Sequence, residues 1–193
     1  MIPLQARRII DFHDGCQAIE AASELWRAIE DNHRCNGLLW HEEDQARRRN
    51  VPDSEIAGNK RAIDAYNQKR NDAIERIDEN ILALFSEIKP GARLSSETPG
   101  AMTDRLSILS LKIHHMRLQT RRNDVTSAHI GNCVLKLNRL IEQRTDLAAC
   151  LDRLLDECAR GESYFKVYRQ FKMYNDPTLN PAVYGESSGS RRP

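Results

Sequence analysis

The sequence has few of the residues that build β-sheets. It contains five valines, and aromatic residues make up only 6% of its 193 residues. No stretch alternates apolar and polar residues in the period of two that a half-buried strand requires. Helix breakers are also absent from long segments, because no proline and no further glycine falls between Gly100 and Gly131 or between Gly131 and Gly161. Long segments of this kind, with apolar residues at helical spacing, predict an all-α protein.

The chain has no excess of either charge and no long apolar run. It has 29 basic and 28 acidic side chains, which give a formal net charge of +1. This balance argues against a general binder of nucleic acid or of anionic membranes. No apolar run approaches the roughly 20 residues that cross a bilayer, and the first residues lack the apolar core of a signal peptide. We therefore expect a cytoplasmic protein with no membrane span and no nucleic-acid partner.

Motifs for disulfides, metals and nucleotides are missing too. The five cysteines are odd in number and form no CxxC pair, which indicates free thiols in a reducing compartment. The chain has no Walker loop, GxGxxG, GxSxG or HExxH motif. His33, His115 and His129, with Glu30 three residues before His33, leave a histidine-rich metalloprotein as one alternative. A diiron bundle needs a second Glu-x-x-His, and this sequence has none. We therefore expect no metal and no cofactor.

The breakers and caps that are present divide the chain into helices. We expect a first helical region over 4–49, with a break near Asp14-Gly15 or Gly37, and further helices over 54–88, 99–121 and 124–160. A short aromatic helix should follow over 162–174. Residues 175–186 should be irregular but ordered, with apolar anchors at Leu179, Val183 and Tyr184. The prediction is one domain over 1–186, a mostly antiparallel bundle of four long helices plus a short C-terminal helix, and a disordered tail over 187–193.

One loop offers two interpretations. Thr98 is a good N-cap, and Pro99 suits the first helical turn because its missing N–H costs nothing there. The same loop, SSETPG, could instead bind an anion at the helix N-terminus, with Arg93 and Arg105 nearby. Capping alone explains Thr98 and Pro99, so we favour the plain cap.

Polar residues interrupt the apolar seams of the long helices. In the helix over 54–88, positions in steps of three and four are aliphatic in the second half but include Asn67 and Arg70 in the first. The region before it likewise changes from apolar residues to Asn36 and Glu43. Antiparallel folding brings these positions to one level, together with His115. Since an unpaired buried polar group costs roughly 1–3 kcal/mol, the helices enclose either a structural polar network or a ligand pocket, and both interpretations stay open.

Four long segments carry a family resemblance: NGLLWHEEDQARR (36–48), NKRAIDAYNQKRNDAIERID (59–78), SETPGAMTDRLSILSLKIHHM (96–116) and FKVYRQFKMYNDPTLNPAVY (165–184). Together they resemble an uncharacterised bacterial family, the domain of unknown function numbered forty-two fifty-four. No activity is assigned to that family. Its genes lie near glycosyltransferases of bacterial surface glycans, so the resemblance implies a link to cell-envelope sugar metabolism. Its motif positions fall on Asn36, Trp40, Glu43, Asp44, Arg47, Asn67, Arg70, Asn71, Asp78, Glu97, Asp104, Arg105 and Lys112.

The seams and the resemblance together define the candidate ligand-binding residues. These are Asn36, Trp40, Glu43, Asp44, Arg47, Asn67, Arg70, Asn71, Asp104, Arg105 and His115. The preferred interpretation is a non-catalytic helical protein that binds a polar small molecule, or a partner protein in surface-glycan biosynthesis. The alternative is an enzyme that acts on a sugar or nucleotide-sugar, with Glu43, Asp44 or Asp104 as acid or base. Helices of about 35 residues extend roughly 50 Å, longer than a small bundle needs, and predict a homodimer.

Overall fold

A computed structural model describes residues 4–15, 23–85, 88–170, 173 and 176–188. Its helices are α1 (Ala6–His13), α2 (Glu24–Gln45), α3 (Asp53–Leu82), α4 (Pro99–Thr120), α5 (Ser127–Ala159) and α6 (Pro181–Ser188). Two short strands, β1 (Arg93–Leu94) and β2 (Ser163–Tyr164), pair in parallel. The protein is all-α and has four long helices, as the sequence predicts.

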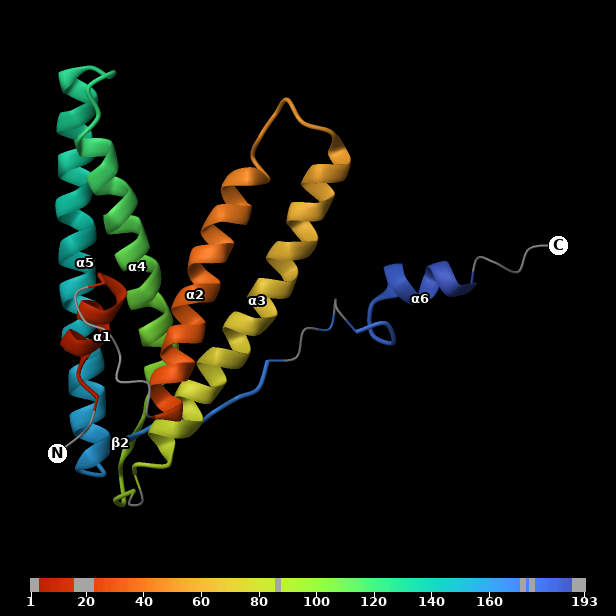
Figure 1. Cartoon of the computed structure of the whole chain (residues 1–193). Coiled ribbons are helices and arrows are strands. Elements are labelled where there is room, and N and C mark those ends of the chain that lie inside the picture. The colour runs from red at the N-terminus through yellow and green to blue at the C-terminus, as the bar shows by residue number, and fades with distance from the viewer. Residues whose placement is uncertain (1–3, 16–22, 86–87, 171–172, 174–175, 189–193) are drawn as a thin grey trace.

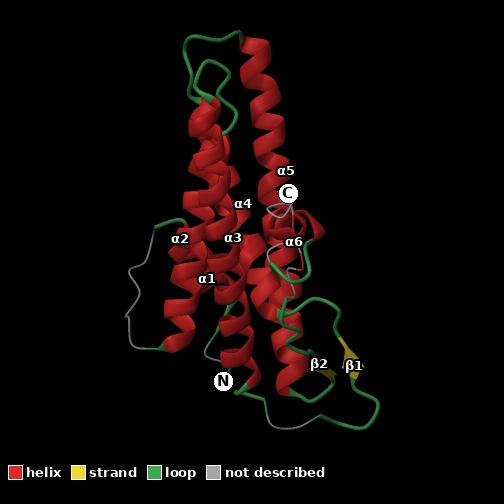
Figure 2. Cartoon of the chain, turned by 90° about the vertical axis from the view of Figure 1, so that its right-hand side faces the viewer, coloured by secondary structure: helices red, strands yellow, loops and turns green. Residues whose placement is uncertain are grey.

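The long helices form two antiparallel hairpins that lie beside each other at one end only. Figure 1 shows α2 with α3 in one hairpin and α4 with α5 in the other. The hairpins meet near the end of α3 and the start of α4, and they diverge toward the turns at residues 46–52 and 121–126. Seen from the side, the axes of the four long helices are roughly aligned (Figure 2). The bundle is therefore closed at one end and splayed at the other.

The apolar core occupies the closed end. Its fully buried members come from every long helix and from α1: Leu4, Ile9, Ile29, Ile77, Ile81, Leu106, Leu151 and Leu155. Helix α1 packs on α4 and α5 there, and its Ala6 N–H donates to Asp152 Oδ1 at 2.8 Å. These aliphatic side chains recur at helical spacing. Their burial stabilises the closed end, because apolar burial is the main stabilising term in folding. The polar halves of α2 and α3 lie toward the splayed end.

The N-terminus of α4 is held against α3 by Asp78. This buried carboxylate accepts hydrogen bonds from the Gly100 N–H and the Thr98 hydroxyl, both at 2.6 Å. Burial raises the pKa of Asp78 to about 6, although these two hydrogen bonds act in the opposite direction. Thr98 also accepts from the Ala101 N–H, which confirms the plain cap. A side chain of the protein itself thus satisfies the helix end that the anion interpretation needed.

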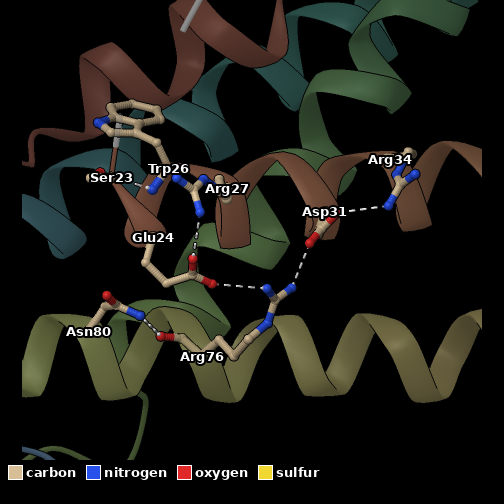
Figure 3. A network of polar contacts seen from close by, with 8 residues as sticks. All are labelled: Ser23, Glu24, Trp26, Arg27, Asp31, Arg34, Arg76 and Asn80. Carbon is tan, nitrogen blue, oxygen red and sulfur yellow. Dashed lines mark hydrogen bonds and ion pairs between the residues drawn. The ribbon is translucent and has the colours of Figure 1, made fainter. Parts of the chain in front are cut away.

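An ionic bridge joins α2 to α3 along the first hairpin. The Arg76 guanidinium on α3 contacts Glu24 at 3.3 Å and Asp31 at 2.7 Å, both on α2 (Figure 3). Asp31 also pairs with Arg34 at 2.7 Å, and these arginines lower the pKa of Asp31 although partial burial opposes them. Glu24 and Asp31 lie seven residues apart on the same face of α2. Because one arginine of α3 contacts both acids, it fixes the register of the two helices.

The first helical region is broken at the earlier of its two expected breaks. Helix α1 ends at His13, and Gly15 has a φ of +73°, a left-handed conformation that favours glycine. Residues 16–22 lie outside the described residues. Helix α2 then runs through Gly37 without interruption. The break at Asp14-Gly15 is confirmed.

The expected aromatic helix over 162–174 is wrong. Gly161, with a φ of +69°, ends α5, and the chain continues as β2 and an extended segment through Gln170. Ser163 and Phe165 are buried, whereas Glu162, Lys166 and Tyr168 are exposed. Burial therefore alternates with a period of two over this short segment, which is typical of a strand and not of a helix. Residues 171–172 and 174 lie outside the described residues.

Three other expectations about helix ends and the C-terminus need correction. Helix α3 ends at Leu82 instead of residue 88, and Leu84 and Ile88 are exposed. Leu179 and Tyr184, expected as apolar anchors, are about half exposed, and the side chain of Val183 lies outside the described residues. Residues 187 and 188 belong to α6, which stands apart from the two hairpins (Figure 1), and residues 189–193 are not described.

Gly100 permits the close contact between α3 and α4, and replacing it tests that contact. A Cβ at this position would lie 2.5 Å from the Ile74 carbonyl oxygen and 2.8 Å from Asp78 Cγ. We expect Gly100→Ala to lower the free energy of unfolding by about 1–3 kcal/mol, because overpacking forces the backbone to shift.

Gly58→Ala on α3 is the matched control. A Cβ there meets nothing within 4 Å, so the change should stabilise the helix by about 0.5–1 kcal/mol. Urea unfolding measures both variants. Equal effects at the two sites would show that the α3–α4 contact is not as tight as described.

Candidate functional site

A cleft lies between the two hairpins where they diverge. It consists of two adjoining hollows of about 330 Å³ and 600 Å³, which share Trp40, Asp44 and Lys112. The first hollow lies between α2, α3 and α4, and the second between α2, α4 and α5. We call them together the inter-hairpin cleft. Seven of the candidate residues line the first hollow: Asn36, Trp40, Glu43, Asp44, Arg47, Asn67 and Arg70.

A buried carboxylate lies behind two residues that line the first hollow, Asn36 and Arg70. Asp104 on α4 accepts hydrogen bonds from the side-chain amides of Asn32 at 2.8 Å and Asn36 at 2.9 Å, both on α2. The Asn36 amide also lies 3.0 Å from the hydroxyl of Ser107. All four side chains are buried. We call this group, with Arg70 above it, the Asp104 hub. It ties α2 to α4 through polar bonds at the level where the apolar core ends.

Arg70 on α3 stands between the hub and the cleft. Its Nε lies 3.9 Å from Asp104 Oδ1, an ion-pair distance but beyond a hydrogen bond. This Nε is buried without a hydrogen-bond partner among the described residues. The side chain is 28% exposed, which leaves the rest of the guanidinium accessible from the cleft. Arg70 thus forms an ion pair with Asp104, but no described residue of another helix accepts a hydrogen bond from it.

An aromatic pair separates the two hollows. The ring of Trp40 on α2 stacks on that of His115 on α4, with centroids 4.3 Å apart and planes 4° from parallel. Burial and the neighbouring His114 lower the pKa of His115, against the opposing effect of Asp44. Trp40 borders both hollows, whereas His115 borders only the second. The pair spans the two hairpins at the point where they separate.

The two adjacent acids on α2 differ in their contacts. Glu43 forms an ion pair with Arg47 at 2.9 Å, one turn later on the same helix. Asp44 is exposed and borders both hollows. Lys60 pairs with Asp64 on α3, while the α2–α3 contact at this level is made by Asn59, which donates to Glu42 at 2.7 Å. Helical spacing points the two neighbouring acids in different directions, and only Asp44 faces the shared part of the cleft.

The structure does not bring all the candidate residues together. Asn71 is bonded to Gln170 at 2.7 Å and lines a separate hollow of about 430 Å³ beside the C-terminal segment. Arg105 is exposed and pairs with Glu97, outside the cleft. His129 lies 3.4 Å from the sulfur of Cys133 and borders neither hollow of the cleft.

Sequence reasoning missed several residues that the structure brings into the site. Asn32 and Ser107 belong to the hub, and both could have been found by helical spacing, since Asn32 precedes Asn36 by four and Ser107 follows Asp104 by three. Lys136 and Arg139 line the second hollow. Their position on α5 relative to α2 depends on the angle between the hairpins, which no sequence spacing encodes.

Two histidines lie behind the hub, at its junction with α1. The rings of His13 and His33 stack with centroids 4.4 Å apart, and His33 Nδ1 lies 2.8 Å from the Ser107 hydroxyl. Burial lowers the pKa of both rings. Within the described part of the chain, no group of three or more His, Cys, Asp or Glu residues could hold a metal ion, and no helix is long and apolar enough to cross a membrane.

These features define an all-α protein of two splayed hairpins, with a cleft between them that both charged and apolar side chains line. The chain belongs to the DUF4254 family of proteins of unknown function, whose family model matches residues 26–167. That range covers both hairpins apart from the first two residues of α2, and every residue that lines the cleft. Comparison with curated proteins and with solved structures gave no match.

The contacts predict a large loss of stability for a change in the hub and a small loss for a change at the rim of the cleft. Asp104→Ala removes the acceptor of two buried amides and the ion-pair partner of Arg70, so we expect a loss of about 3 kcal/mol or more. Glu43→Ala breaks an ion pair whose members are 47% and 68% exposed, so the loss should stay below about 1 kcal/mol. Urea unfolding of both variants against the parent measures the difference. Similar losses would mean that Asp104 is not the structural centre.

Proposed function

We propose that this protein binds a polar small molecule in the inter-hairpin cleft. The single observation that supports this most strongly is Arg70, a cation at the cleft floor whose Nε has no hydrogen-bond partner among the described residues. Natural structures pair nearly all buried polar groups, and an unpaired one next to a cleft is suited to a ligand. Both hollows also fall within the usual size range of small-molecule sites.

We propose that binding is not coupled to catalysis. The acids that an enzyme would use are already engaged, because Glu43 pairs with Arg47 and Asp104 accepts from two amides. Asp44 is exposed and lines both hollows, and no described side chain forms a hydrogen bond or ion pair with it. An enzyme that acts on a sugar or nucleotide-sugar remains the second candidate, and Asp44 beside His115 is the observation that favours it.

The surrounding process we propose is bacterial surface-glycan biosynthesis in the cytoplasm. The family resemblance implies this link through the neighbouring glycosyltransferase genes. A cleft lined by amides, charged groups, aliphatic side chains and an aromatic pair is suited to a glycan precursor, since sugars bind through hydrogen bonds and ring stacking.

We further propose that the protein is a homodimer. The far half of the second hairpin carries exposed apolar side chains that no described element covers: Leu118, Val134 and Leu135. Light scattering at tens of micromolar should give twice the 22.1 kDa mass of one chain. A monomer mass at that concentration would contradict the proposal.

A ligand panel tests the proposed function. Thermal unfolding should be measured with neutral sugars, sugar phosphates, nucleotides and organic acids, since a ligand at 100 times its Kd adds about 2.7 kcal/mol. Stabilising compounds should lose their effect in Trp40→Leu, which removes the wall between the hollows, and keep it in Trp26→Leu, whose tryptophan packs on Phe12 outside the cleft.

The same panel separates the two candidate functions. Compounds that stabilise the protein should be recovered unchanged after incubation, as chromatography of the mixture will show. Conversion of a bound compound would favour the enzyme, and conversion should then be lost in Asp44→Asn. No stabilisation by any polar compound would contradict the binding proposal.

A further inference from the structure

Arg70 offers a set of hydrogen-bond donors that the protein leaves unused. A guanidinium carries five N–H donors in one plane, and no described residue accepts a hydrogen bond from any of them. The nearest acid atom, Asp104 Oδ1, is 3.9 Å from Nε. Asp104 is itself held by the amides of Asn32 and Asn36. Asp104 therefore forms an ion pair with Arg70 but accepts no hydrogen bond from it.

The side chains around Arg70 make the cleft electropositive. Five cationic residues line the two hollows, against two acidic residues, Glu43 and Asp44. The cations are Arg47, Arg70, Lys112, Lys136 and Arg139. Arg47 pairs with Glu43 and Arg139 with Glu142, whereas Lys112 and Lys136 form no ion pair with an acid among the described residues. This local excess contrasts with the formal net charge of +1 for the whole chain.

We infer that the ligand of the cleft carries an oxyanion, a phosphate or carboxylate group, and that Arg70 is its anchor. The inference rests on the proposed function and names the chemical class of its ligand. A planar guanidinium binds these groups through two parallel hydrogen bonds, which a lysine cannot do. Lys112 borders both hollows and adds a second positive charge to the same group.

The aromatic pair sets where the rest of the ligand lies. Trp40 stacks on His115 through one face and borders the hollow that holds Arg70. A flat or ring-shaped group on the ligand therefore meets the indole while its anionic group reaches Arg70. Arg70 and Trp40 line the same hollow. Together they favour small molecules in which an oxyanion is attached to a ring.

Tryptophan signals can report on this subsite directly. The chain has two tryptophans, so Trp26→Phe identifies the indole N–H resonance of Trp40 by elimination. Pyrophosphate, citrate and glucose should be titrated at constant ionic strength, because surface attraction to anions is screened by salt. We expect saturable shifts of the Trp40 resonance with pyrophosphate or citrate. The stronger of the two distinguishes a phosphate site from a carboxylate site.

Variants locate the anion. Arg70→Gln should weaken the binding of pyrophosphate or citrate by about tenfold or more, and Lys112→Gln, an exposed change that leaves the fold intact, by several-fold. Arg105→Gln is the matched control, because Arg105 is an exposed arginine that pairs with Glu97 outside the cleft. Its affinity should equal that of the parent. The Trp26 resonance shows whether each variant remains folded.

Two outcomes would overturn the inference. The first is no response of Trp40 to either anion. The second is a response that Arg70→Gln leaves unchanged. If glucose shifts the Trp40 resonance and the anions do not, the first outcome applies, yet the proposed function is supported, because a neutral ligand would then occupy the cleft.

Discussion

The structure depends on a buried ion held by neutral amides. Asp104 is placed where α2, α3 and α4 meet, and two asparagines from α2 satisfy one of its oxygens. A buried carboxylate without such donors would cost several kcal/mol, so the position of α2 relative to α4 follows from this contact. Below the hub the helices pack through aliphatic side chains. Above it the hairpins separate, and the polar halves of α2 and α3 face a cleft.

A second constraint fixes the closed end from which the hairpins diverge. Gly100 allows α4 to approach the backbone of α3, and Asp78 bonds the helix end across the contact. Helix α4 is thus held at two levels, by Asp78 of α3 at its N-terminus and through its own Asp104 one turn later. These two contacts set the angle between the hairpins. The cleft is a consequence of that angle, since the same helices packed in parallel would bury Trp40, Arg70 and Lys112 against one another. Ligand binding and hairpin geometry are therefore linked through Arg70.

The sequence predicted the architecture well because breakers and caps act locally. Four long helices, the break at Asp14-Gly15 and the Thr98 cap were all predictable from residues within a few positions. Asn36, Asn67 and Arg70 were found as interruptions of apolar seams, and they line one hollow. Asn71 and Arg105, which the family resemblance added, lie elsewhere, because a shift of one residue turns a side chain by about 100°. The strand at Ser163 was missed because it pairs with a segment 70 residues away.

A crystal structure grown with pyrophosphate tests this account most directly. In that crystal structure we expect the hairpins to diverge above an Asp104 held by Asn32 and Asn36. A phosphate group should lie about 2.7–2.9 Å from the Arg70 guanidinium and near Lys112, beside the ring of Trp40. Hairpins closed along their full length, with the Arg70 guanidinium bonded to Asp104 and no anion between them, would contradict it.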